Sequence, residues 1–148
     1  MPLERERKFI LQYMPELPPH EVKELKQAYL MIASDRQLRV RLIDGEKAII
    51  GYKQKLTSTD RHEFEYEIPY AEGEELYQLA DLKLPKKRCS WSEGELHFDI
   101  DIYPAEVGFN IIEIEYTGEL TTIPGFCGRE VTEDPAYSNI AIALRLKK

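Results

Sequence analysis

The sequence predicts a mainly β protein of the α+β class, in which eight antiparallel strands close into a barrel and a few helices pack outside it. Three observations support this fold. About eight short segments alternate between polar and apolar residues, as strands with two different faces do. Turn residues such as Asp44-Gly45 and Glu93-Gly94 separate neighbouring segments, as in hairpins. Charged residues recur at every second position in most segments, so one face of the sheet would be charged and the other apolar.

The first half of the chain is expected to consist of strands. Residues 20–25 follow Pro15, Pro18 and Pro19 and are expected to form a short helical turn before the second strand. Alternation of apolar and polar residues predicts strands at 3–13, 26–32, 37–43, 47–55 and 61–69.

The second half contains the clearest helix signal. Leu76, Leu79 and Ala80 repeat at helical spacing behind an acidic first turn, which predicts a helix over 72–82. Either Ser138 or Asn139 can cap a short closing helix. Alternating segments predict strands at 85–91, 95–103 and 110–117.

The bulk properties are those of a soluble, cytoplasmic protein. A chain of 148 residues is expected to form one domain, 1–148. No apolar run approaches the roughly 18 residues that a membrane span requires, and the N-terminus does not resemble a signal peptide. Cys89 and Cys127 are therefore expected to be free thiols. A net charge of −7 argues against nonspecific binding of nucleic acid. The oligomeric state stays open.

The charged positions are segregated by sign. In the stretch LERERKF, Glu4, Glu6 and Lys8 share one face of the first strand. The other pairs at a spacing of two are basic at Arg39 and Arg41, Lys53 and Lys55, and Lys86 and Arg88, and acidic at Glu63 and Glu65, Asp99 and Asp101, and Glu113 and Glu115. A solvated sheet face would usually mix in uncharged polar residues. We therefore expect this face to line the inside of the barrel as a charged tunnel.

Such a tunnel suits a metal-bound polyanion. Arginine and lysine bind phosphate oxygens, and clustered carboxylates bind a hard divalent cation such as Mg²⁺. Together they predict metal-assisted chemistry on a phosphate chain, in which charge neutralisation supplies most of the catalysis. The sequence contains no GxxxxGK[ST] motif, which excludes a Walker-type nucleotide site.

The same residues resemble a known family. Glu4-x-Glu6-x-Lys8 resembles the ExExK signature that opens the CYTH proteins, also called triphosphate tunnel metalloenzymes. One departure is Ala28, where the family has glycine. Further segments are similar to family strands in the same order: QAYL (27–30), LRVR (38–41), IIGYK (49–53), RHEFE (61–65), KKR (86–88), FDIDIY (98–103), IIEIEY (111–116) and EVTEDPAYSN (130–139).

The resemblance implies an eight-stranded tunnel that binds a linear triphosphate together with Mg²⁺ or Mn²⁺, and it implies roles by position. The expected phosphate-binding residues are Lys8, Arg39, Arg41, Lys53, Arg61, Lys86 and Arg88. The expected metal ligands are Glu4, Glu6, Glu113 and Glu115. The residues expected to take part in catalysis are Glu4, Glu6, Lys8, Glu63, Glu65 and Asp101.

The activity implied is hydrolysis of inorganic tripolyphosphate to pyrophosphate and phosphate. Alternatives are a nucleoside or thiamine triphosphatase, an adenylate cyclase using the same tunnel, and a sensor that binds polyphosphate or nucleotide without cleaving it. The complete acidic set favours an enzyme, because carboxylates without a metal would repel a polyanion. No nucleic-acid or membrane partner is expected.

Several single residues stay open at this level. Either Lys53 or Lys55 faces the tunnel, because a bulge at Gly51 would shift the strand face. Tyr29 either packs or closes the tunnel floor, and Trp91 either packs at the rim or stacks on an organic group. The three histidines, His20, His62 and His97, show no ligand spacing and are expected to be structural or exposed.

Overall fold

The structure is a computed structural model that describes residues 3–57 and 59–147, with the side chains of Leu3 and Glu4 outside the description. The described strands are β1 (Leu3–Leu11), β2 (Glu21–Ile32), β3 (Arg36–Ile43), β4 (Lys47–Lys55), β5 (Asp60–Ile68), β6 (Leu82–Glu93), β7 (Leu96–Ile102), β8 (Ile111–Tyr116) and β9 (Cys127–Glu130). The described helices are α1 (Tyr70–Leu79), α2 (Asn139–Leu146) and two 3₁₀ helices, η1 (Ala105–Val107) and η2 (Pro135–Tyr137).

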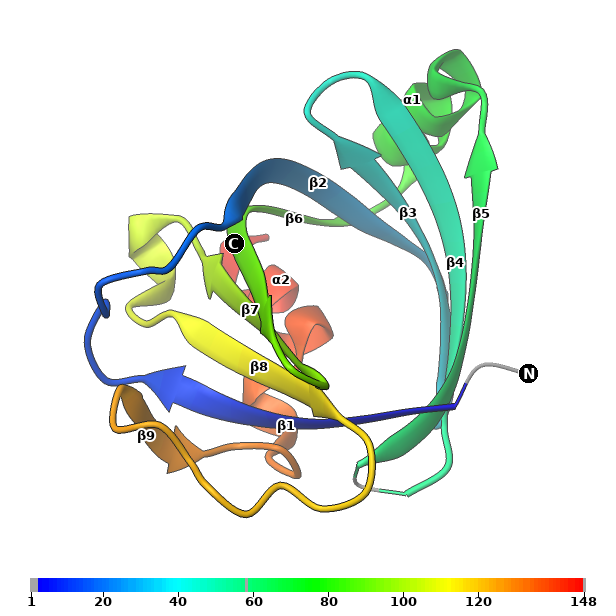
Figure 1. The fold of residues 1–148 in the computed structure, drawn as a ribbon. Helices are drawn as coiled ribbons and strands as arrows, with labels where there is room; N and C mark the ends of the chain where they lie inside the picture. The colour runs from blue at the N-terminus through cyan, green and yellow to red at the C-terminus, as the bar shows by residue number, and fades with distance from the viewer. Residues whose placement is uncertain (1–2, 58, 148) are drawn as a thin grey trace.

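The strands β1 to β8 form a closed antiparallel barrel (Figure 1), in the order β5-β4-β3-β2-β6-β7-β8-β1. The barrel closes where β1 pairs with β5, with Glu4 opposite Arg61. The short strand β9 pairs with the C-terminal half of β1, where Glu130 lies opposite Phe9. The predicted eight-stranded barrel is confirmed.

The central hairpins keep a continuous register. Asp44 and Gly45, the first two of the three residues between β3 and β4, both have positive φ angles, 52° and 68°, and the Glu46 amide closes the turn by donating to the Ile43 carbonyl at 3.0 Å. Gly51 pairs with Arg39 on one side and Glu65 on the other without any shift in register. The bulge considered at Gly51 is therefore not present, and the whole of β4 keeps one alternation of faces.

Three local features differ from the sequence prediction. The helical turn expected at 20–25 is part of β2, because Glu21–Leu25 pair with Lys86–Ser90 of β6 and this ladder outweighs the weak local helix signal. The sequence analysis did not predict β9, whose four residues CGRE carry no alternating apolar pattern. The strand β6 also begins earlier than predicted, at Leu82.

Two apolar clusters cover the outer face of the barrel. One places Ala28 and Val40 against α1 through Leu76 and Tyr77. The helix lies so close to β4 that a Cβ atom on Gly73 would come within 2.3 Å of the Ala48 side chain, so glycine is required there. The other contains the buried residues Phe9, Cys89, Trp91, Phe98, Ile100, Ile112 and Ile114, packed against Leu11, Leu17, Leu96, Ile102, Leu120, Phe126 and Cys127.

The second helix differs from the expectation that helices lie outside the barrel. Figure 1 shows α2 at one end of the barrel, behind β8. Its Ile142 and Ala143 are buried against inward-facing residues at that end of the strands, Tyr29, Leu82, Leu84, Tyr103 and Ile111. The apolar side of this short helix thus closes an apolar end of the barrel. In the described parts of the chain, no helix has the length and apolar character to cross a membrane.

Candidate active site

The charged face of the strands lines two adjoining cavities. The inner cavity, about 140 Å³, lies inside the barrel between β1, β3 to β8 and the start of α2. The outer cavity, about 370 Å³, opens between the β2–β3 and β4–β5 connections and residues 132–140. The residues that line both cavities, called the junction below, are Glu6, Lys53, Arg61, Glu113 and Asn139.

Arg39 and Arg41 on β3 form a basic wall of the inner cavity. Arg39 is buried and donates to Glu63 at 3.0 Å. Arg41 donates through Nε and Nη2 to the side-chain oxygen of Gln27, at 3.2 and 3.1 Å. Burial and the neighbouring charges of Arg39 and Arg88 lower the pKa of Arg41. A bound anion would offset the repulsion among these three guanidinium groups. Sequence reasoning missed Gln27, whose amide orients Arg41.

Lys53 and Lys55 both lie on the inward face of β4, but only Lys53 lines the inner cavity. Lys53 lies at the junction, with its Nζ 3.7 Å from the Glu63 carboxylate. Lys55 is exposed and lines only the outer cavity. Burial, followed by the charges of Arg61 and Arg39, lowers the pKa of Lys53 to about 7.

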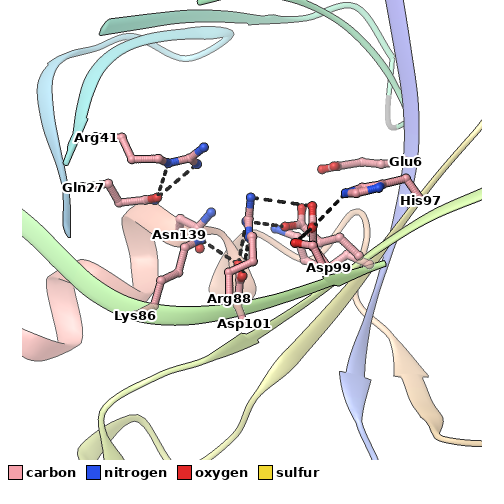
Figure 2. A network of polar contacts seen from close by, with 12 residues as sticks. Glu6, Gln27, Arg41, Lys86, Arg88, His97, Asp99, Asp101 and Asn139 are labelled. Carbon is pink, nitrogen blue, oxygen red and sulfur yellow. Dashed lines mark hydrogen bonds and ion pairs between the residues drawn. The ribbon is translucent and has the colours of Figure 1, made fainter. Parts of the chain in front are cut away.

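Lys86, Arg88 and Asp101 form a buried ion cluster between β6 and β7 (Figure 2). Lys86 Nζ lies 2.6 Å from one Asp101 oxygen, and Arg88 donates to both oxygens at 2.7 and 2.9 Å. Burial alone would raise the pKa of Asp101, but the two cations hold it well below its usual value. Of the three, only Arg88 lines the inner cavity, where it also reaches Glu113 at 3.4 Å.

Glu6 and Arg61 pair where β1 and β5 close the barrel. Arg61 donates to Glu6 Oε2 at 2.6 Å, and its second Nη atom contacts Oε1. Burial opposes the charge on Glu6, yet Arg61 holds the pKa of this carboxyl well below its ordinary range. Glu6 is therefore ionised at neutral pH although it is 9% exposed.

Carboxylates gather on the opposite wall because of strand register. Glu6 pairs directly with Glu115 across β1 and β8, and Glu113 pairs with Lys8 on one side and Asp99 on the other. Glu6, Asp99, Glu113 and Glu115 all line the inner cavity. Oxygen ligands of this kind suit a hard divalent cation. Of the four predicted metal ligands, three are thus brought together, and the side chain of Glu4 lies outside the described residues.

A second group of candidate ligand atoms includes His97, which sequence reasoning missed as a possible ligand. His97, Asp99 and Glu115 each offer one ligand atom within 4.8 Å of the others. His97 contacts Asp99 at 3.0 Å through Nε2 and Ser92 at 3.0 Å through Nδ1. Residues 97, 99 and 101 alternate onto one face, so strand parity was the signal that could have identified His97.

The remaining predicted site residues lie at the edges of the cavities. Lys8 lines the outer cavity, with its Nζ 3.5 Å from the carbonyl oxygen of Tyr137. Glu65 lines the inner cavity, 3.6 Å from Arg39, and its side chain is 41% exposed. Glu63 also lines the inner cavity, between Arg39 and Lys53.

The two aromatic residues left open by the sequence occupy different places. Tyr29 is buried at the closed end of the barrel, and its hydroxyl accepts from Gln27 Nε2 at 2.8 Å. It therefore supports the amide that orients Arg41. Trp91 stacks on Phe98 in the outer apolar cluster, with a centroid distance of 4.9 Å, and donates to Glu93. Trp91 lines neither of the two cavities.

Comparisons with known proteins point to one group of enzymes. The chain is 33% identical over 119 residues to an inorganic triphosphatase of Acetivibrio thermocellus, covering 77% of this chain and 76% of that protein. It is 30% identical over 152 residues to an inorganic triphosphatase of Nitrosomonas europaea, covering 97% and 98%. The crystal structure of the inorganic triphosphatase NE1496 matches with a TM-score of 0.69 and 27% identity, covering 97% of this chain and 96% of that one. No family model matches the sequence.

Proposed function

Because the chain belongs to the CYTH family of triphosphate tunnel metalloenzymes, together with the inorganic triphosphatases to which it is similar, we propose that it hydrolyses a linear triphosphate inside its barrel. The proposed substrate is inorganic tripolyphosphate, and the proposed products are pyrophosphate and phosphate. The proposed cofactor is Mg²⁺ or Mn²⁺.

One observation carries the proposal: cations and carboxylates line the inner cavity together. Arg39, Arg41 and Arg88 line one part of the inner cavity, and Glu113 and Glu115 line another. A phosphate chain along this surface would contact several guanidinium groups, which bind phosphate oxygens through paired hydrogen bonds. This supports substrate recognition through the phosphates alone.

The acidic wall fits the proposed cofactor. Glu6, Glu113 and Glu115 would hold a divalent cation, because their carboxylates line the inner cavity and Glu6 is ionised. When bound, the ion would neutralise charge on the phosphate oxygens and activate a water molecule. Arg61, which pairs with Glu6, would then be available to contact a phosphate oxygen. Binding of substrate and cofactor would thus separate ion pairs, such as Glu6–Arg61, that the side chains form with one another.

Substrate choice tests the proposal. Phosphate release is measured from tripolyphosphate, ATP, GTP, thiamine triphosphate and pyrophosphate, each with Mg²⁺ and with EDTA. We expect kcat/KM to fall from tripolyphosphate to ATP and further to pyrophosphate, with little difference between ATP and GTP, because the cavities are lined by phosphate-binding groups. A preference of about tenfold (about 1.4 kcal/mol) for one nucleotide or for thiamine triphosphate would overturn the proposed substrate. Release from none of them would favour a sensor.

A further inference from the structure

The first residue of α2 lies where substrate would lie. Asn139 lines both the inner and the outer cavity, together with Glu6, Lys53, Arg61 and Glu113. Figure 2 shows its side chain projecting into the same opening as those of the arginines on β3 and β6. A helix that closes one end of the barrel therefore also presents an uncharged amide to the junction.

Tyr103 fixes the orientation of this amide. The Tyr103 hydroxyl donates to Asn139 Oδ1 at 2.8 Å, and Tyr103 is itself buried. Burial, followed by the charges of Asp101 and Glu113, raises the pKa of Tyr103 well above its usual value, so the phenol keeps its proton. With Oδ1 engaged, the Nδ2 atom carries the two donors that are left for another partner. Within residues 3–57 and 59–147, the structure gives Nδ2 no hydrogen-bond acceptor.

The segment before Asn139 is held in place by its own hydrogen bonds. Ser138 caps α2 by accepting from the Ala141 amide at 3.1 Å, and its hydroxyl donates to the Pro135 carbonyl at 3.0 Å. The Tyr137 carbonyl accepts from Lys8 Nζ at 3.5 Å. An amide mounted on such a support loses little conformational freedom when it binds a ligand.

We propose that Asn139 is a phosphate-binding residue supplied by the helix that closes the barrel, and that Tyr103 is its positioning residue. The inference rests on the proposed function, because the ligand is the triphosphate. The Nδ2 donors contact a non-bridging oxygen of the phosphoryl group at the junction, beside Glu6 and Glu113. A neutral donor adds a directed hydrogen bond there without adding charge.

A purely structural role would be different. In that case the Tyr103–Asn139 hydrogen bond only ties α2 to the end of β7. Removing either side chain would then lower stability equally and leave substrate binding alone. The two roles separate because Tyr103→Phe and Asn139→Ala both break the tie, whereas only the second removes the donors. Asn139→Asp keeps an acceptor for Tyr103 and also removes the donors.

The experiment measures kcat and KM for tripolyphosphate with Mg²⁺, tripolyphosphate binding by calorimetry in EDTA, and thermal unfolding. The variants are Asn139→Ala, Asn139→Asp, Tyr103→Phe and the double variant Asn139→Ala/Tyr103→Phe. The control is Gln54→Ala, which truncates an amide bonded to Tyr52 on the outer face of β4. If the wild-type protein neither binds nor cleaves tripolyphosphate, the proposed function itself fails.

With an active wild-type protein, we expect Asn139→Ala to raise KM about tenfold (about 1.4 kcal/mol) and to leave kcat within about threefold, as loss of a ground-state contact does. Asn139→Asp should raise KM further while unfolding near the wild-type temperature. Tyr103→Phe should raise KM less than Asn139→Ala, and the double variant should match Asn139→Ala. The inference would be overturned if the KM of Asn139→Ala lay within twofold of the KM of the wild-type protein, or within twofold of the KM of the control Gln54→Ala.

Discussion

The buried ion cluster and the junction are built from the same kinds of residue but differ in access to the cavities. In the buried ion cluster, Asp101 is fully buried and both Lys86 and Asp101 line neither cavity. At the junction, Lys53 and Arg61 face both cavities, with side chains 20% and 13% exposed. Ions that a ligand cannot reach keep their partners, whereas ions that line a cavity can exchange them. Lys86 and Asp101 are therefore expected to maintain the barrel, whereas Arg88, which lines the inner cavity, and the ions of the junction can exchange partners.

The largest expected effect comes from breaking the buried ion cluster. Asp101→Ala leaves the buried Lys86 without its carboxylate partner, while Arg88 keeps Asp99 and Glu113, so we expect the free energy of unfolding to fall by about 3–5 kcal/mol. Chemical denaturation measures this loss. Asp101→Asn, which keeps the size and one acceptor, should lose less. A loss below about 1 kcal/mol for Asp101→Ala would mean that water reaches the cluster.

The matching change at the junction should affect turnover and spare the fold. Glu6→Gln keeps the size of a side chain that faces a cavity, while it removes a proposed metal ligand. We expect Mg²⁺-dependent turnover to fall on the order of 100-fold or more, with a smaller loss of stability than in Asp101→Ala, because glutamine keeps an acceptor for Arg61. Turnover near the wild-type value would show that Glu6 serves only to pair with Arg61.

The basic wall should give intermediate effects on substrate handling. Arg39→Ala and Arg41→Ala each remove a charged hydrogen-bond donor proposed to contact phosphate. For each we expect a decrease in kcat/KM that corresponds to a loss of about 1.5–3 kcal/mol in transition-state stabilisation. Arg41→Lys should recover only part of this loss, because the paired guanidinium donors are missing. Full activity in Arg41→Lys would show that a single positive charge is sufficient at this position.

The smallest expected effect is a proton taken up on binding. Because the pKa of Lys53 is about 7 in the free protein, this lysine is mostly neutral at pH 8, and a nearby phosphate would raise its pKa. Tripolyphosphate binding at pH 8 should therefore draw up to about one proton onto Lys53, and below about pH 6 it should draw none. Calorimetry in two buffers of different ionisation enthalpy measures the uptake. Equal uptake by Lys53→Met would exclude Lys53 as its source.

Strand parity explains how much of this site could be predicted. Alternation alone placed Arg39, Arg41 and Glu113 on one face, and closure of the barrel turned that face inward. Pairing across strands could not be predicted, because it depends on the stagger between β1, β5 and β8, which no single strand encodes. For this reason the contacts of Glu6 with Arg61 and of Arg88 with Asp101 emerge only from the structure.

The position of α2 was beyond sequence reasoning for a different reason. Its apolar residues Ile142 and Ala143 indicate only that one side of the helix is buried. Whether that side packs on the outer wall or on an open end depends on where the barrel has apolar residues that no other element covers, such as Leu84 and Ile111. The role proposed for Asn139 follows from that placement: the family-like segment EVTEDPAYSN (130–139) includes this residue but assigns it no contact with substrate.

The most direct test of the account is a Mg²⁺ titration of phosphate release from tripolyphosphate, carried out with wild type, Glu113→Gln and Glu130→Gln. Glu113 lines both cavities, whereas Glu130 pairs with Arg7 on the outer face of β1 and serves as a matched control. We expect no release in EDTA, saturable release by wild type and Glu130→Gln, and little or none by Glu113→Gln. Release in EDTA, or equal Mg²⁺ dependence in all three proteins, would contradict a metal-dependent triphosphatase site in the tunnel.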